Sequence, residues 1–231
     1  LKDFYLPEGY NIPSETVIKE YIGSYLKLLD DYQYMEIHFA FPLEVLQDFS
    51  DYRMIVLTRD PRDMIVSYYF QLYAGSIHIY YHDAPEYKEK ALIELINYGF
   101  VGIFNTKFYL FPPAKQLLND YLIAMKLPLS FMLRFEDLNV SEEQTYLRLL
   151  KWLKLHPDPF QPLTHSVLQT AIYQGTFEYQ TQGRKKRGEE SSTLDLTSNC
   201  RKGVSGDWKQ HFTPAVIEAF KQQTGTGLIE L

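Results

Sequence analysis

Apolar residues recur at helical spacing along several stretches of the chain. Ile18, Ile22 and Leu29 would share one face of a helix that begins near Pro13. Asp60 is a good N-cap residue and Pro61 suits the first helical position, so a second helix is expected from there to about residue 73. The same periodicity predicts further helices near residues 86–97, 112–126, 142–154, 163–173 and 214–222.

Short continuous apolar runs lie between these helices and predict strands. The clearest covers residues 53–58, a β-rich run of the kind that is buried in parallel sheets. Residues 35–39 and 129–134 form two more, the latter followed by an acidic turn at Glu136 and Asp137. Strands that alternate with helices predict an α/β fold with a central, mainly parallel sheet flanked by helices. We expect one domain over residues 1–231.

Residues 180–206 combine Gly, Ser, Thr and Asn with a basic cluster and show no periodicity. We expect a long ordered loop there, and loops of this length are usually functional.

Composition narrows the function classes. The formal net charge of −6 argues against nucleic acid as the main partner. Cys200 is the only cysteine, which excludes an internal disulfide and favours a cytoplasmic location. No apolar run reaches the roughly 18 residues of a membrane span, so no membrane segment is expected in this chain. The histidines show no metal-ligand spacing, and no metal site is expected.

One candidate anion site lies where the strand of residues 53–58 meets the next helix. The N-terminus of that helix offers unpaired N–H groups, and Arg59 adds a fork of donors beside it. Ser67, about two turns into the helix, would add a hydroxyl. The alternative is that Arg59 pairs with Asp60 or Asp63 and that Ser67 only packs against a neighbouring helix.

A second candidate is the segment Arg-Lys-Gly-Val-Ser-Gly-Asp-Trp at residues 201–208. Two cations neutralise an anion, and two glycines let the backbone approach it closely. The alternative is a solvated turn before the last helix.

Three segments in this order resemble the PAPS-dependent sulfotransferase family, which uses 3′-phosphoadenosine 5′-phosphosulfate (PAPS) and releases 3′,5′-ADP (PAP). They are Arg-Asp-Pro-Arg-Asp at 59–63 with Ser-Tyr-Tyr at 67–69, Arg-Phe-Glu-Asp-Leu at 134–138, and the segment at 201–208. The resemblance extends over roughly residues 34–222. It implies a P-loop-like sulfotransferase fold, PAPS as cosubstrate and no metal.

The resemblance also implies roles for individual residues. Phe135 and Phe177 would lie near the adenine, and the stretch from Thr176 to Glu190 is similar to the soluble bacterial-type members. The residues that would hold the 3′-phosphate are Arg59, Ser67, Arg201, Lys202 and Gly203.

His38 lies at the end of a predicted strand, some twenty residues before Arg59, where the family has a conserved histidine. A histidine of ordinary pKa near 6.5 is suited to remove the proton of an attacking alcohol. The resemblance therefore implies that His38 is the general base. A single histidine is also often structural, and that alternative stays open.

The sequence departs from the family in two places. The family's Lys-Ser-Gly-Thr-Thr-Trp-like loop for the 5′-phosphosulfate has no counterpart in residues 1–37, and the chain begins with Leu1 rather than Met. We therefore expect that the first strand and this loop are missing from the chain. In the family's dimer motif Pro214 replaces Val, which leaves a homodimer open.

The acceptor is expected to be a small-molecule or carrier-bound hydroxyl compound. Two other functions remain. One is a catalytically inactive PAP-binding module. The other is an ATP-using P-loop kinase relative, against which the absence of a Walker sequence and the Arg-Lys-Gly segment speak.

Overall fold

The structure is a computed structural model. It describes residues 16, 19–20, 47–48, 51–74, 85–104, 107–153, 165–183, 187–188 and 202–225. Most of the helix expected from Pro13 and all of the strand expected at 35–39 lie outside the described residues.

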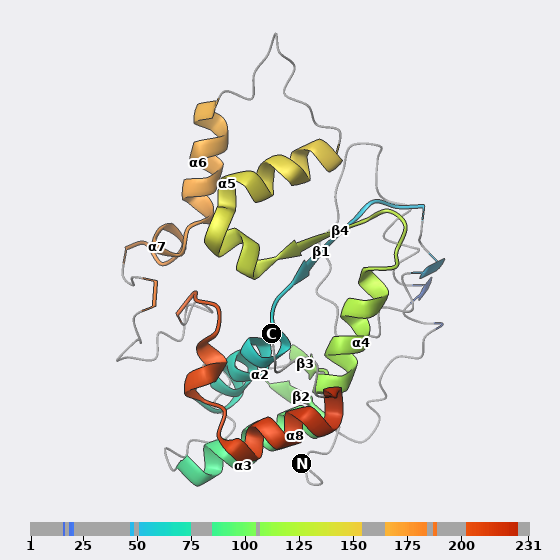
Figure 1. Ribbon diagram of the computed structural model, residues 1–231, viewed down its shortest axis with the longest axis vertical. Coiled ribbons are helices and arrows are strands. Elements are labelled where there is room, and N and C mark those ends of the chain that lie inside the picture. The colour runs from blue at the N-terminus through green and yellow to red at the C-terminus, as the bar shows by residue number, and fades with distance from the viewer. Residues whose placement is uncertain are drawn as a thin grey trace.

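Two parallel strands form the sheet that organises the candidate site (Figure 1). Strand β1, Met54–Thr58, pairs with β4, Ser130–Arg134, from Met54 opposite Ser130 to Thr58 opposite Arg134. Both strands were predicted from their apolar runs, and the parallel pairing is confirmed. Because the strands run in the same direction, the residues that follow them, Arg59 and Phe135, emerge at the same edge.

The burial of β1 differs from the prediction of a fully buried strand. Thr58 is buried, but Ile55 is 48% exposed and Leu57 is 67% exposed. Successive side chains of a strand point to opposite faces, so Ile55 and Leu57 share one face of the pair. That face of β1 is therefore exposed to solvent at these two positions.

Helix α2, Pro61–Tyr69, begins where the sequence predicts. Asp60 is its N-cap and its Oδ1 atom accepts a hydrogen bond from the Arg62 N–H at 2.9 Å. Pro61 occupies the first helical position, where its missing N–H costs nothing. The helix continues into a π-helical turn, η2, at Phe70–Ala74.

The main hydrophobic core lies where four helices meet, on the far side of α2 from the strands (Figure 1). Helix α2 packs against α3, Pro85–Tyr98, and both contact α4, Ala114–Ala124. Helix α8, Pro214–Thr224, closes the group against α3 and α4. The fully buried apolar side chains of this four-helix core include Ile65, Val66, Leu72, Leu92, Ile96, Ala114, Val216 and Phe220.

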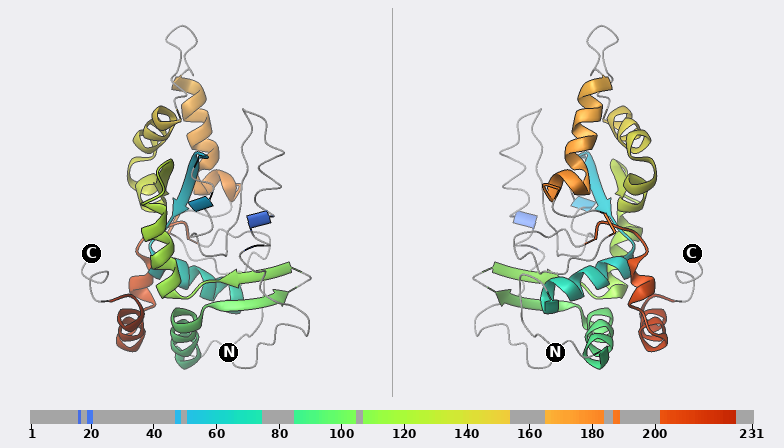
Figure 2. Two further views of the ribbon diagram at one scale, coloured as in Figure 1. Left: turned by 90° about the vertical axis from the view of Figure 1, so that its right-hand side faces the viewer. Right: turned by 90° about the vertical axis from the view of Figure 1, so that its left-hand side faces the viewer.

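An antiparallel hairpin beside α2 and α3 was not predicted (Figure 2). It consists of β2, Phe100–Phe104, and β3, Lys107–Phe111. Gly99 turns the chain into it with φ +65°, and a Cβ there would lie 2.1 Å from the Phe111 carbonyl oxygen. Only glycine fits this crossing.

Helix α5, Phe135–Trp152, starts earlier than predicted. The expected start near residue 142 and the expected turn at Glu136 and Asp137 are wrong, because the chain enters a helix directly after β4. Ser141, with φ −147° and ψ 59°, kinks this helix, so its second half matches the predicted element. The remaining elements are α6, His165–Gly175, α7, Phe177–Gln180, and the 3₁₀ turn η3, Asp207–Gln210. Among the described helices, none has both the length and the apolar character of a membrane span.

We predict that Leu92→Ala lowers the free energy of unfolding by about 2–5 kcal/mol, because it opens a cavity in a fully buried site. Leu122→Ala is the matched control, since Leu122 is 43% exposed and its loss should cost less than about 1 kcal/mol. Urea unfolding followed by circular dichroism measures both. Equal losses would contradict the position of the core.

Candidate functional site

Arg59 lies at the carboxyl end of β1 and is surrounded by three separate segments. Its Nη2 atom donates a hydrogen bond to the Val204 carbonyl oxygen at 2.9 Å. Its guanidinium carbon lies 4.5 Å from the centre of the Phe135 ring, at the first turn of α5. These contacts bring the predicted residues Arg59 and Phe135 together beside the loop of residues 202–208.

The backbone of Arg59 is held by Tyr121 from α4. The Tyr121 hydroxyl donates to the Arg59 carbonyl oxygen and accepts from the Arg59 N–H at 3.2 Å. Burial raises the pKa of Tyr121 above its ordinary value, so the phenol keeps the proton that it donates. Next along the chain, the Asp60 N–H donates to Glu136 Oε1 at 2.8 Å. The strand end is therefore fixed from both α4 and α5.

One donor of Arg59 is unused. Its Nε atom is buried and has no hydrogen-bond partner in the part of the chain that the structure describes. Asp63 Oδ2 lies 4.0 Å from Nη2, and Asp60 pairs instead with Arg62 at 2.6 Å. The alternative that Arg59 only pairs with a neighbouring carboxylate therefore holds in part, because Arg59 pairs with Asp63. This pair does not use Nε, which stays without a partner. A buried donor without a partner costs free energy, and an anion would satisfy it.

Phe177 and Gly203 form the second contact between predicted residues. Gly203 has φ +66°, and a Cβ at this position would lie 2.4 Å from the Phe177 ring. Phe177 is buried at the start of α7, where the Thr176 hydroxyl accepts from the Tyr179 N–H. The loop backbone therefore packs directly on the Phe177 ring, and a side chain at residue 203 would collide with that ring.

Asp63 ties this loop to α2 and was not identified from the sequence as a site residue. Its carboxylate accepts from the Gly206 N–H at 2.7 Å and from the Trp208 N–H at 2.9 Å. Burial raises the pKa of Asp63, while these two hydrogen bonds and the Arg59 charge act in the opposite direction. The Arg62 guanidinium stacks 4.1 Å above the Trp208 ring. The sequence offered only weak signals, because these partners are far apart in the chain.

Comparison with known proteins agrees with this geometry. The family model described as the sulfotransferase domain matches residues 17–228. The chain belongs to the sulfotransferase family. The resemblance noted in the sequence is thereby confirmed.

Curated relatives of this sulfotransferase-family chain include human sulfotransferase 1E1, 25% identical over 171 residues that cover 74% of this chain and 53% of the relative. Mouse sulfotransferase 1 family member D1 is 22% identical over 177 residues, covering 75% of this chain and 54% of the relative. The chain spans about half the length of the curated relatives it matches.

Solved structures share the fold. Retinol dehydratase in complex with androsterone and the inactive cofactor PAP superposes with a TM-score of 0.59, at 17% identity, over 89% of this chain and 59% of that protein. Mouse sulfotransferase SULT7A1 complexed with PAP gives 0.53, at 16% identity, over 78% and 59%. The predicted α/β class is therefore confirmed.

The structure brings only some of the predicted site residues of this family member together. Arg59 with Phe135, and Gly203 with Phe177, meet around one loop. Ser67 is half-buried on α2, and no hydrogen bond within the described residues joins its side chain to the others. His38 and Arg201 lie outside the described residues.

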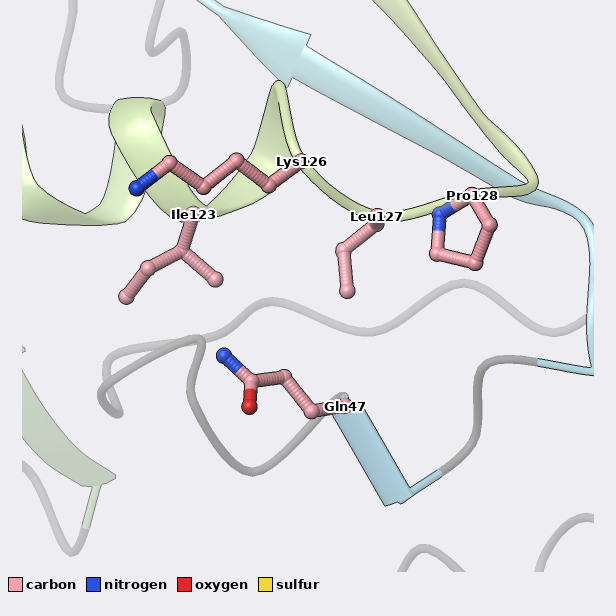
Figure 3. Close-up of a pocket in the computed structure, with 5 residues that line it drawn as sticks. All are labelled: Gln47, Ile123, Lys126, Leu127 and Pro128. Carbon is pink, nitrogen blue, oxygen red and sulfur yellow. The ribbon is translucent and has the colours of Figure 1, made fainter.

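A cavity of ≈ 270 Å³ lies away from this arrangement (Figure 3). Gln47 lies across it from Ile123 and Leu127, and Lys126 and Pro128 complete its lining. Leu127 and Pro128 lie two to three residues before β4, so the cavity is at the amino end of the strand pair. Arg59 is at the opposite end, where ligands of such sheets bind.

Lys202 points into the protein. Its buried ammonium donates to Asp207 Oδ1 at 3.0 Å and to Gln210 Oε1 at 3.3 Å. Asp207 Oδ2 is also 3.1 Å from His211 Nε2. The ammonium is thus engaged within the protein, and any contact of Lys202 with a ligand is assigned to its backbone.

We predict that Lys202→Met lowers the free energy of unfolding by about 3–5 kcal/mol, because Asp207 would lose the ammonium that neutralises it in a buried ion pair. Lys209→Met is the control, since Lys209 is exposed in the same segment and should change stability by less than about 1 kcal/mol. Denaturant unfolding at neutral pH compares them. A stable Lys202→Met variant would show that the pair is not structural.

Proposed function

We propose that this protein is a PAPS-dependent sulfotransferase that transfers a sulfuryl group to a hydroxyl of an acceptor. The observation that carries the proposal is the buried, unpartnered Nε of Arg59 at the carboxyl end of β1, beside a loop that crosses Phe177 at Gly203. A cation with an unused donor suits a phosphate, and the aromatic rings of Phe135 and Phe177 suit a purine. Relatives of this fold are known in complex with PAP.

In this proposal, the 3′-phosphate lies between the start of α2 and the loop of residues 201–203. Arg59 binds it with its free donor, and the Ser67 hydroxyl lies along the same helix. Arg201 adds a second cation, and the backbone of Lys202 and Gly203 lies against the phosphate, held there because Gly203 lets the loop pack directly on the Phe177 ring. Phe135 and Phe177 flank the adenine.

PAPS supplies an activated sulfuryl group whose leaving group is the 5′-phosphate of the nucleotide. His38 acts as general base and takes the proton of the acceptor hydroxyl as the new sulfur–oxygen bond forms. Cations around the nucleotide stabilise the charge that develops on the leaving group. Retinol dehydratase was crystallised with androsterone and, in a second structure, with retinol, and we propose an acceptor of the same chemical class, an apolar alcohol.

A second candidate is a PAP-binding module that does not transfer sulfate. Tight binding of PAP without transfer from PAPS to any acceptor would support it.

We expect PAP to raise the melting temperature more than 5′-AMP or ATP does. At a hundredfold excess over its dissociation constant, a ligand that binds only the folded state stabilises it by about 2.7 kcal/mol. Arg59→Gln should abolish the PAP effect. Arg148→Gln, which removes an exposed cation from α5, should keep it. A shift with ATP but not with PAP would refute the proposal.

His38→Asn should lower the turnover number by about 10²- to 10⁴-fold, because the acceptor loses its general base. The affinity for PAP should stay within about twofold, since a proton acceptor contributes to the transition state rather than to nucleotide binding. Sulfate transfer from PAPS to retinol and androsterone measures the effect, with His156→Asn as control. Full activity of the His38 variant would remove His38 from the mechanism.

A further inference from the structure

The carboxylate of Asp63 is a buried anion that accepts hydrogen bonds from a segment distant in sequence. Asp63 is 1% exposed, although aspartates are rarely fully buried without partners. Oδ2 accepts from the Gly206 N–H and Oδ1 from the Trp208 N–H, across sequence separations of 143 and 145 residues. Both oxygens therefore fix the backbone of one loop to the first turn of α2.

Arg59 holds the same loop at a second point, between two glycines. Gly203 and Gly206 both have left-handed backbone conformations, with φ +66° and +80°. The Val204 carbonyl oxygen between them accepts a hydrogen bond from Nη2 of Arg59. Arg59 binds an acceptor of the loop, and Asp63, four residues later on the start of α2, binds two of its donors.

The orientation of the Arg59 guanidinium follows from this arrangement. Nη2 is directed to Val204, and the face of the guanidinium lies over the Phe135 ring. Nε is the buried donor that neither contact uses. If the loop shifted, Nη2 would lose its acceptor and the guanidinium would turn, so that the direction of the Nε–H bond would change.

We propose that Asp63 is a positioning residue for the 3′-phosphate site. It fixes the loop of residues 203–208, and through Val204 it fixes the Arg59 guanidinium in the orientation that presents its free donor to the nucleotide. Asp63 does not touch the ligand, because both of its oxygens are used by the loop. This inference rests on the proposed function, since PAP is the ligand of the site.

Loss of charge alone has to be separated from loss of the two hydrogen bonds. Asp63→Asn keeps the side-chain size but places an amide NH₂ against one of the two backbone N–H donors. Asp60→Asn removes the same charge from the same end of α2, and asparagine retains the N-cap hydrogen bond to Arg62. Asp60 accepts no hydrogen bond from the loop within the described residues, so it is the matched control.

The test is isothermal titration calorimetry with PAP and with 5′-AMP, which lacks the 3′-phosphate. For Asp63→Asn, we expect the dissociation constant of PAP to rise on the order of tenfold or more, and that of 5′-AMP by less than about threefold. Asp60→Asn should leave the ratio of the two constants within about twofold of wild type. A merely structural role would weaken both nucleotides equally, and that result would overturn the inference.

The outcomes distinguish the two proposals. Wild-type protein that does not bind PAP refutes the proposed function, whereas PAP binding that Asp63→Asn leaves unchanged refutes only the role of Asp63. If circular dichroism shows that Asp63→Asn does not fold, amide hydrogen exchange of the wild-type protein decides. PAP should then slow exchange at Gly206 and Trp208 more than 5′-AMP does, and equal protection by both nucleotides would overturn the inference.

Discussion

Arg59, which is half-buried, and Asp63, which is fully buried, hold polar groups of the same loop, and the arrangement of the site depends on this. The Asp63 carboxylate could not stay buried alone, because removing an ion from water costs several kcal/mol unless partners replace the solvent. The loop supplies those partners with two N–H groups at Gly206 and Trp208, and it gives Arg59 an acceptor at the Val204 carbonyl. These hydrogen bonds therefore join the strand end, the start of α2 and the loop to one another.

The groups that stabilise this arrangement also surround the proposed nucleotide site. Asp207 anchors the buried ammonium of Lys202 and contacts His211, so the loop is also tied to the segment that leads into α8. Arg62 stacks on Trp208 while it pairs with Asp60. Buried ion pairs add little net stability but enforce one geometry. A loop fixed in this way keeps its backbone close to Phe177, where Gly203 leaves room for nothing larger.

The sequence predicted those parts of the fold that local signals determine. The apolar run of β1, the N-cap at Asp60 and the proline after it specify a strand and a helix start within a few residues. The hairpin of β2 and β3 was missed, because its short aromatic strands are defined by packing and by the crossing at Gly99. The start of α5 was missed because Arg134 provides no side-chain cap. For the site, motifs indicated Arg59 and Gly203, but the inward direction of the Lys202 ammonium and the role of Asp63 depend on tertiary contacts.

Hydrogen bonds within the protein hold the part of the proposed site that the structure describes. They fix the positions of Arg59, Val204 and Gly206, and a loop held in this way costs less to order when a nucleotide binds. Ordering of loops and side chains is one of the main costs of association, and a preformed site avoids it. Two buried side-chain donors have no partner within the described residues, Nε of Arg59 and Nη1 of Arg62, and such a donor costs about 1–3 kcal/mol while it is unsatisfied. In the proposed function, a 3′-phosphate at Arg59 Nε would recover this free energy, whereas a nucleotide without a 3′-phosphate would not. Selection of the 3′-phosphate would then rest on a donor whose burial costs stability.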